Sequence, residues 1–149
     1  MIGPVAPWWT VAVRTMATYR IVGAATELTA ARVTSALEVS PTKSGERGER
    51  PTPRSPVAHA SWWSLASGAE PDDATELSTQ LDRVLAKLTA RREALWALAD
   101  EGYEMDWSCY VGSHATEHAV ELSRQLMERL LAIPGELLLD VYSDEPDEG

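Results

Sequence analysis

The sequence contains a single cysteine, Cys109, and no apolar run long enough to cross a bilayer. A lone cysteine excludes an intramolecular disulfide and favours a reducing cytoplasm. A membrane-spanning helix needs about 20 consecutive apolar residues. The apolar start of the chain, residues 1–13, is shorter than that and lacks the positively charged region of a signal peptide. We therefore predict a cytoplasmic protein.

Basic residues are also scarce, because 13 Lys and Arg stand against 23 Asp and Glu, which gives a net charge of −10. Nucleic acids and anionic membranes bind cationic surfaces, so we expect neither as a partner. With 149 residues and an apolar fraction of 44%, the chain is large enough for one self-sufficient hydrophobic core.

Common catalytic signatures are missing as well. The sequence has neither a glycine-rich phosphate loop between a strand and a helix nor a nucleophile elbow. Cys109 alternates with Trp107 and Val111 in a strand pattern, which predicts an inert thiol in the core. We expect no cofactor. Enzymatic activity stays open, with a non-catalytic role favoured.

One motif matches a metal-binding pattern, since residues 114–118 read H-x-x-E-H with His114, Glu117 and His118. The chemistry needs both histidines on one face of a helix, beside a glutamate that activates the metal-bound water. Here the motif follows a strand, and few residues remain after it. His114 and His118 are therefore weak candidates for a metal site, to which His59 could contribute.

Hydrophobic periodicity predicts four strands, at residues 17–22, 59–66, 103–111 and 136–142. Residues 103–111 alternate most cleanly, which indicates a sheet with one covered and one open face. Helices are expected at 30–38, across 75–100 as one kinked or two separate helices, and after Ser123. The predicted fold is α+β, with a four- to five-stranded antiparallel or mixed sheet and about three helices mainly on one face.

Local signals refine these boundaries. Thr29, Thr89 and Ser123 are predicted N-caps, and Gly102 is expected to end the helical stretch before it. The helix after Ser123 carries Leu126, Leu130 and Leu131, and in the last strand Leu137, Leu139 and Val141 are expected to face the core.

The composition divides the chain into three parts. Residues 1–14 are interpreted as an N-terminal extension, 15–143 as a single α+β domain, and 144–149 as an acidic tail. Within the domain, residues 40–57 form a basic Pro- and Gly-rich loop with four lysines or arginines against two glutamates. Such a long connection is either a mobile surface loop or a segment that folds over a bound anion or an acidic partner.

The order of these segments resembles a known family. The features are Tyr19-Arg20-Ile21-Val22-Gly23, Pro41-Thr42, Trp63-Ser64-Leu65, Gly102-Tyr103, Cys109-Tyr110, Glu121-Leu122-Ser123 and Leu139-Asp140-Val141-Tyr142. Over about residues 15–143 they are similar to the bacterial domain-of-unknown-function family numbered 4279. The family pattern implies a glycine-rich turn before Glu121, where this chain has the His-containing stretch instead, so the His pair is interpreted as individual to this protein. The resemblance implies a small bacterial α+β domain and carries over no activity.

The outward positions of the four predicted strands would gather aromatic, charged and hydroxyl side chains on one surface. A polar organic ligand or a peptide suits such a mixture. The predicted ligand-binding residues are Arg20, Trp62, Ser64, Asp106, Ser108, Tyr110, Asp140 and Tyr142.

Three functions follow from the sequence. The first is a non-catalytic binding domain that uses this surface and the basic loop. The second is a protein-interaction role, as an immunity-type antagonist or a homodimer subunit, through the acidic surface and Leu138. The third and weakest is a metal-dependent hydrolase around His114, Glu117 and His118. The partner is thus an unknown small molecule or protein.

Overall fold

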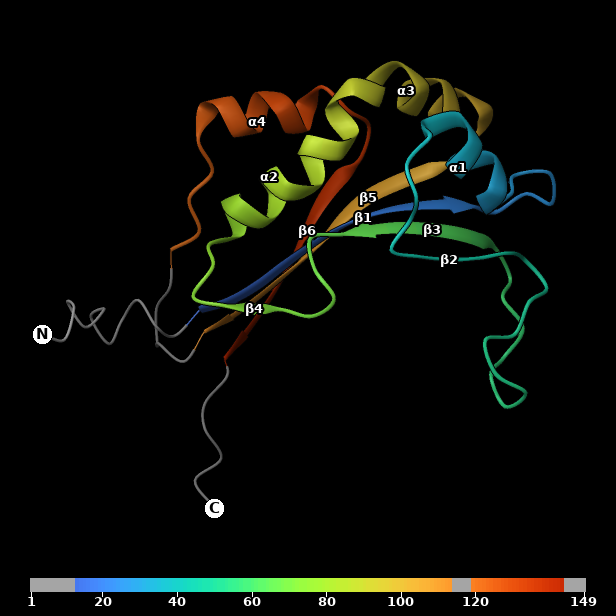
Figure 1. The fold of residues 1–149 in the computed structure, drawn as a ribbon, viewed down its shortest axis with the longest axis horizontal. Coiled ribbons are helices and arrows are strands. Elements are labelled where there is room, and N and C mark those ends of the chain that lie inside the picture. The colour runs from blue at the N-terminus through green and yellow to red at the C-terminus, as the bar shows by residue number, and fades with distance from the viewer. Residues whose placement is uncertain (1–12, 114–118, 144–149) are drawn as a thin grey trace, which may run out of the picture.

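The computed structural model describes residues 13–113 and 119–143, which form one layer of β-sheet covered by helices on one side (Figure 1). The sheet order is β2-β3-β1-β5-β6, and the short β4 pairs with β1 beside β3. The strands are β1 (Val13–Gly23), β2 (Lys43–Gly45), β3 (Ser61–Ala66), β4 (Asp72–Asp73), β5 (Glu104–Ser113) and β6 (Glu136–Ser143). All pairings are antiparallel except β5 with β6, which is parallel.

The helices lie together above the sheet, and the opposite face is bare of them (Figure 1). They are α1 (Ala30–Leu37), α2 (Leu77–Leu88), α3 (Arg92–Glu101) and α4 (Arg124–Leu131). A 3-10 turn, Thr89–Arg91, joins α2 to α3. The predicted α+β fold with a mixed sheet and helices on one face is confirmed.

The core lies between the helices and the sheet. Along β1 every second residue is buried, from Val13 to Gly23, because successive strand side chains point to opposite faces. The largest fully buried side chains on the strands are Tyr19, Trp63 and Trp107. Tyr19 packs edge-on against Trp107, with 5.0 Å between ring centroids, and donates a hydrogen bond to the Pro134 carbonyl. Leucines of α2 and α3 belong to the same buried cluster as these rings.

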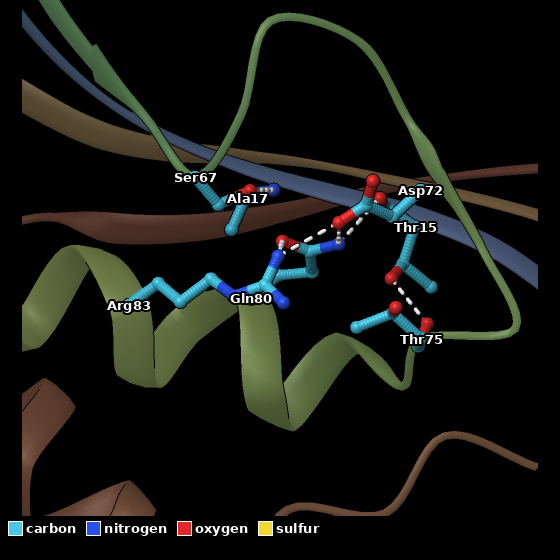
Figure 2. Close-up of polar contacts among 7 residues, drawn as sticks. All are labelled: Thr15, Ala17, Ser67, Asp72, Thr75, Gln80 and Arg83. Carbon is cyan, nitrogen blue, oxygen red and sulfur yellow. Dashed lines mark hydrogen bonds and ion pairs between the residues drawn. The ribbon is translucent and has the colours of Figure 1, made fainter.

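Between β3 and β4 the chain leaves the sheet, so part of the edge of β1 has no strand beside it. Side chains complete its hydrogen bonding there (Figure 2). The Ser67 hydroxyl accepts from the N–H of Ala17 in this stretch at 3.0 Å. Next to it, where Thr15 pairs with Asp72 of β4, the buried Gln80 of α2 donates from Nε2 to the Thr15 carbonyl at 2.9 Å. Gln80 therefore attaches α2 to the sheet through a polar contact inside an apolar interface.

Most boundary signals in the sequence are confirmed. Thr29 and Ser123 cap α1 and α4 by accepting N–H groups of the first turn, and Gly102 ends α3 with φ +113°. Thr89 was wrongly predicted as an N-cap. Its hydroxyl donates instead to the Leu85 carbonyl, so it continues the end of α2 rather than starting α3.

Two residues of β6 were wrongly placed in the core. Leu139 and Val141 are 38% and 66% exposed, and Leu131 at the end of α4 is also exposed. The alternation of β6 is as predicted, but β6 is the last strand of the sheet and the helices cover it incompletely.

The basic loop at residues 40–57 contains a strand that its composition concealed. β2 lies inside it and pairs with β3. Beyond β2 the loop closes on itself, since Gly48 donates its N–H to the Ala58 carbonyl and Ala58 donates to the Glu49 carbonyl. It descends on the side of the sheet away from the helices (Figure 1). Within the described residues, no helix is long and apolar enough to cross a membrane.

Candidate binding surface

The face of the sheet opposite the helices, called the open face below, carries all eight predicted ligand-binding residues. Strand registers show this directly, because residues paired across a sheet share a face. Arg20 pairs with both Ser64 and Asp106, while Val22 pairs with Trp62. The remaining pairs are Thr18 with Ser108, Met16 with Tyr110, Tyr110 with Asp140, and Gly112 with Tyr142.

One row of residues across the open face has basic side chains toward one end and acidic side chains toward the other. Lys43 of β2 lies beside Ser64 of β3, which lies beside Arg20 of β1, then Asp106 of β5 and Glu136 of β6. We call these five residues the charged row. Its cations lie on β2 and β1 and its carboxylates on β5 and β6, so positive and negative charge are separated along one direction.

At the centre of the charged row, Arg20 and Asp106 form a bidentate ion pair. The Asp106 carboxylate accepts from Arg20 Nε and Nη2, each at 2.7 Å. This bond raises the pKa of the Arg20 guanidinium further, with smaller effects from the Asp106 and Asp140 charges. The side chains are 44% and 40% exposed, so solvent screens the pair and its role is mainly to hold Arg20 in one orientation.

Trp62 borders the charged row and is fixed by a glycine. It pairs with Gly45 of β2, and a Cβ atom on Gly45 would lie 2.5 Å from Trp62 Nε1. Only glycine leaves room for the indole there. Trp62 lines two depressions. One of about 400 Å³ is lined by Arg20, Ser64 and Asp106, and one of about 360 Å³ by Lys43 and the basic loop.

At the other end of the open face, Tyr110 and Tyr142 stack on each other. Their ring centroids are 5.2 Å apart and the ring planes are inclined by 25°. Asp140 lies beside Tyr110 in the register, and Tyr142 is 52% exposed. Ser108 lies between this aromatic pair and the charged row. The eight residues thus form two groups on one face rather than one compact site.

Sequence reasoning missed Lys43 and Glu136 as members of this surface. Lys43 was assigned to the basic loop as a whole, because a strand of three residues leaves no periodic signal. Glu136 is at the first position of β6 and was read only as a strand end. The pairing of Asp106 with Glu136 depends on a parallel register between β5 and β6, which no local pattern in the sequence encodes.

A larger depression, of about 670 Å³, lies between α2 and α4 on the helical side. Its charged lining residues in the described chain are Glu76, Asp82, Glu121 and Arg129. Arg129 is paired with Asp82, as Arg20 is with Asp106 on the open face, and the three carboxylates make this depression acidic. Among the described residues that line it there is no aromatic ring and no separation of charge like that on the open face.

The candidates for metal or nucleophilic chemistry do not form a site in the described residues. Cys109 is fully buried, and burial, followed by the charge of Asp140, raises the pKa of its thiol to about 12. His59 is exposed on the basic loop side of β3. No group of three or more His, Cys, Asp or Glu is placed to hold a metal ion within residues 13–113 and 119–143. His114, Glu117 and His118 lie outside the described residues.

These features define a class of protein: a single-layer α+β domain with helices on one face of a mixed sheet and a polar, aromatic open face. The chain belongs to the domain of unknown function family DUF4279, whose sequence profile matches residues 13–144. The resemblance found in the sequence is thereby confirmed. No curated protein and no solved structure matches the chain.

Proposed function

We propose that this protein is a non-catalytic binding domain whose open face takes a short peptide or another zwitterionic molecule of similar length. The observation that carries the proposal is the charged row, with two cations at one end and two carboxylates at the other beside a fixed indole ring. A ligand with one negative and one positive end matches this arrangement.

The spacing of the strands sets the length of the ligand. Neighbouring strands lie roughly 4.8 Å apart, so a point between Lys43 and Arg20 is about 12 Å from a point between Asp106 and Glu136. An extended chain covers roughly 3.3–3.6 Å per residue. A free tripeptide therefore spans the charged row with its carboxylate between Lys43 and Arg20 and its ammonium group between Asp106 and Glu136.

The individual contacts follow from the chemistry of the side chains. Asp106 uses Nε and Nη2 of Arg20, which leaves the Nη1 amino group to donate to the ligand carboxylate. Trp62 offers the face of its ring to an apolar central side chain, and Gly45 holds that ring in place. Because the face is open, we expect weak and reversible binding.

The test uses glycyl-phenylalanyl-glycine and measures binding by saturation-transfer NMR and calorimetry. The free tripeptide should bind, and acetylation of its amino end or amidation of its carboxyl end should each weaken binding about tenfold, the equivalent of roughly 1.5 kcal/mol for one charged hydrogen bond. Equal binding of free and capped peptides, or no binding of the free peptide at millimolar concentration, would refute the proposal.

A matched pair of variants locates the site. Trp62→Ala should abolish binding of the tripeptide, whereas Trp96→Ala should leave it unchanged. Trp96 is 47% exposed on α3 and donates to the Ala132 carbonyl, so it controls for loss of a partly exposed tryptophan on the helical side. Thermal unfolding of both variants shows whether they remain folded. Loss of binding in Trp96→Ala alone would move the site to the helices.

A further inference from the structure

A second surface, the outer edge of β6, shares Glu136 with the charged row but can be argued and tested without the open-face ligand. β6 ends the sheet, and no strand among the described residues pairs with its outer edge. Natural edge strands are commonly short or protected by lysine or proline. The other edge of this sheet follows that rule, because β2 has three residues and includes Lys43. β6 has eight residues, with no lysine, arginine or proline.

The apolar side chains of β6 are exposed on both faces of the sheet. On the helical face, Leu139 and Val141 are 38% and 66% exposed, although their partners on β5, Cys109 and Val111, are fully buried. On the open face, Leu138 is 52% exposed. A ligand on one face would cover only one of these sets. Another strand beside β6 would cover both, because its side chains also alternate between the faces.

The sequence of β6 selects one way of pairing with its own copy. In an antiparallel pair about a two-fold axis, residues from one face must meet residues from the same face. A two-fold axis at Leu138 would place Glu136 of one copy opposite Asp140 of the other. An axis at Asp140 would place the two Asp140 carboxylates opposite each other. Like charges directly opposite each other destabilise a sheet.

An axis at Leu139 avoids both conflicts. Leu139 then meets Leu139 of the second copy, Leu137 meets Val141, Leu138 meets Asp140, and Glu136 meets Tyr142. The apolar residues of the helical face meet only apolar residues, and each carboxylate meets an uncharged side chain. This register also pairs the strand over nearly its whole length.

We propose that the protein forms a homodimer in which β6 pairs antiparallel with β6 of a second copy about a two-fold axis at Leu139. The two sheets join into one, and both open faces lie on the same side because the axis is perpendicular to the sheet. Antiparallel pairing supplies backbone hydrogen bonds to the edge of β6, and the side chains of both copies cover Leu139 and Val141.

Cysteine cross-linking tests the register. Leu139→Cys should form an intermolecular disulfide under mild oxidation, because residue 139 faces its own copy. Val141→Cys should stay largely uncross-linked, because residue 141 faces residue 137 and lies far from residue 141 of the second copy. The native Cys109 is fully buried and does not interfere. Cross-linking of Val141→Cys as readily as Leu139→Cys would overturn the register.

Light scattering after size exclusion tests the dimer itself. Wild-type protein should have twice the mass of one chain, and Leu139→Lys should have the mass of one chain while keeping its circular dichroism spectrum. Leu131→Lys is the matched control, since Leu131 is 80% exposed on α4 and outside the strand. It should remain dimeric. A monomeric wild type at high micromolar concentration would overturn the proposal and leave the open-face binding unaffected.

Discussion

Replacement of Gln80 by methionine tests how the helices are attached to the sheet. The side chain of Gln80 is 1% exposed, and its Nε2 atom donates to the carbonyl of Thr15, the residue of β1 that pairs with Asp72 of β4 (Figure 2). Methionine has a similar length and no donor, so Gln80→Met keeps the volume and leaves a buried acceptor without this bond. A buried unsatisfied group costs about 1–3 kcal/mol.

For a chain of this size each kcal/mol shifts Tm by about 2–4 °C, so a cost of about 2 kcal/mol lowers Tm by about 4–8 °C. Thermal and urea unfolding followed by circular dichroism measure both values. Gln125→Met, at an exposed position of α4, is the control and should change the unfolding free energy by less than about 0.5 kcal/mol. If Gln80→Met is as stable as wild type, the hydrogen bond to β1 does not hold α2 on the sheet.

Three further predictions use other parts of the molecule. Because burial raises the pKa of Cys109 to about 12, native protein at pH 8 should react with iodoacetamide far more slowly than urea-unfolded protein, and equal rates would contradict a buried thiol. The pKa of Asp72 is lowered, mainly by a hydrogen bond from Arg83. The ionised carboxylate therefore stabilises the fold at pH values above its ordinary pKa, and this stabilisation is lost as the pH falls through the lowered pKa. Urea midpoints of Asp72→Asn should therefore lie below wild type at pH 6 and converge with it in strong acid, and a constant difference would contradict this origin. Gly45→Val should displace Trp62 and abolish tripeptide binding, which peptide titration by NMR would detect, whereas unchanged binding would show that the indole position is unimportant.

Predictions that rest on a pattern within one strand or helix were correct where the rest of the chain has little influence on that element. Alternation in β1 and β5 gave the correct face for Arg20 and Asp106, because a strand has only two faces and one of them is buried. The caps Thr29 and Ser123 act within a single turn of helix. Their signals are therefore fully contained in a few neighbouring residues.

Features that depend on distant segments could not be predicted in this way. Leu139 and Val141 follow the same alternation as buried residues of β5, yet the position of β6 at the edge of the sheet exposes them. Lys43 joins Ser64 and Arg20 only through the pairing of a three-residue strand. The charged row depends on the registers between five strands, so Arg20, Ser64 and Asp106 were predicted singly, whereas Lys43, Glu136 and the order of the row were not.

The most direct test of the binding surface is a map of amide chemical shifts in labelled protein titrated with glycyl-phenylalanyl-glycine. Our account predicts that the largest shifts occur at Lys43, Ser64, Arg20 and Asp106, across β2, β3, β1 and β5. Shifts concentrated around the acidic depression between α2 and α4, with the sheet unchanged, would contradict the assignment of the open face as the site of binding.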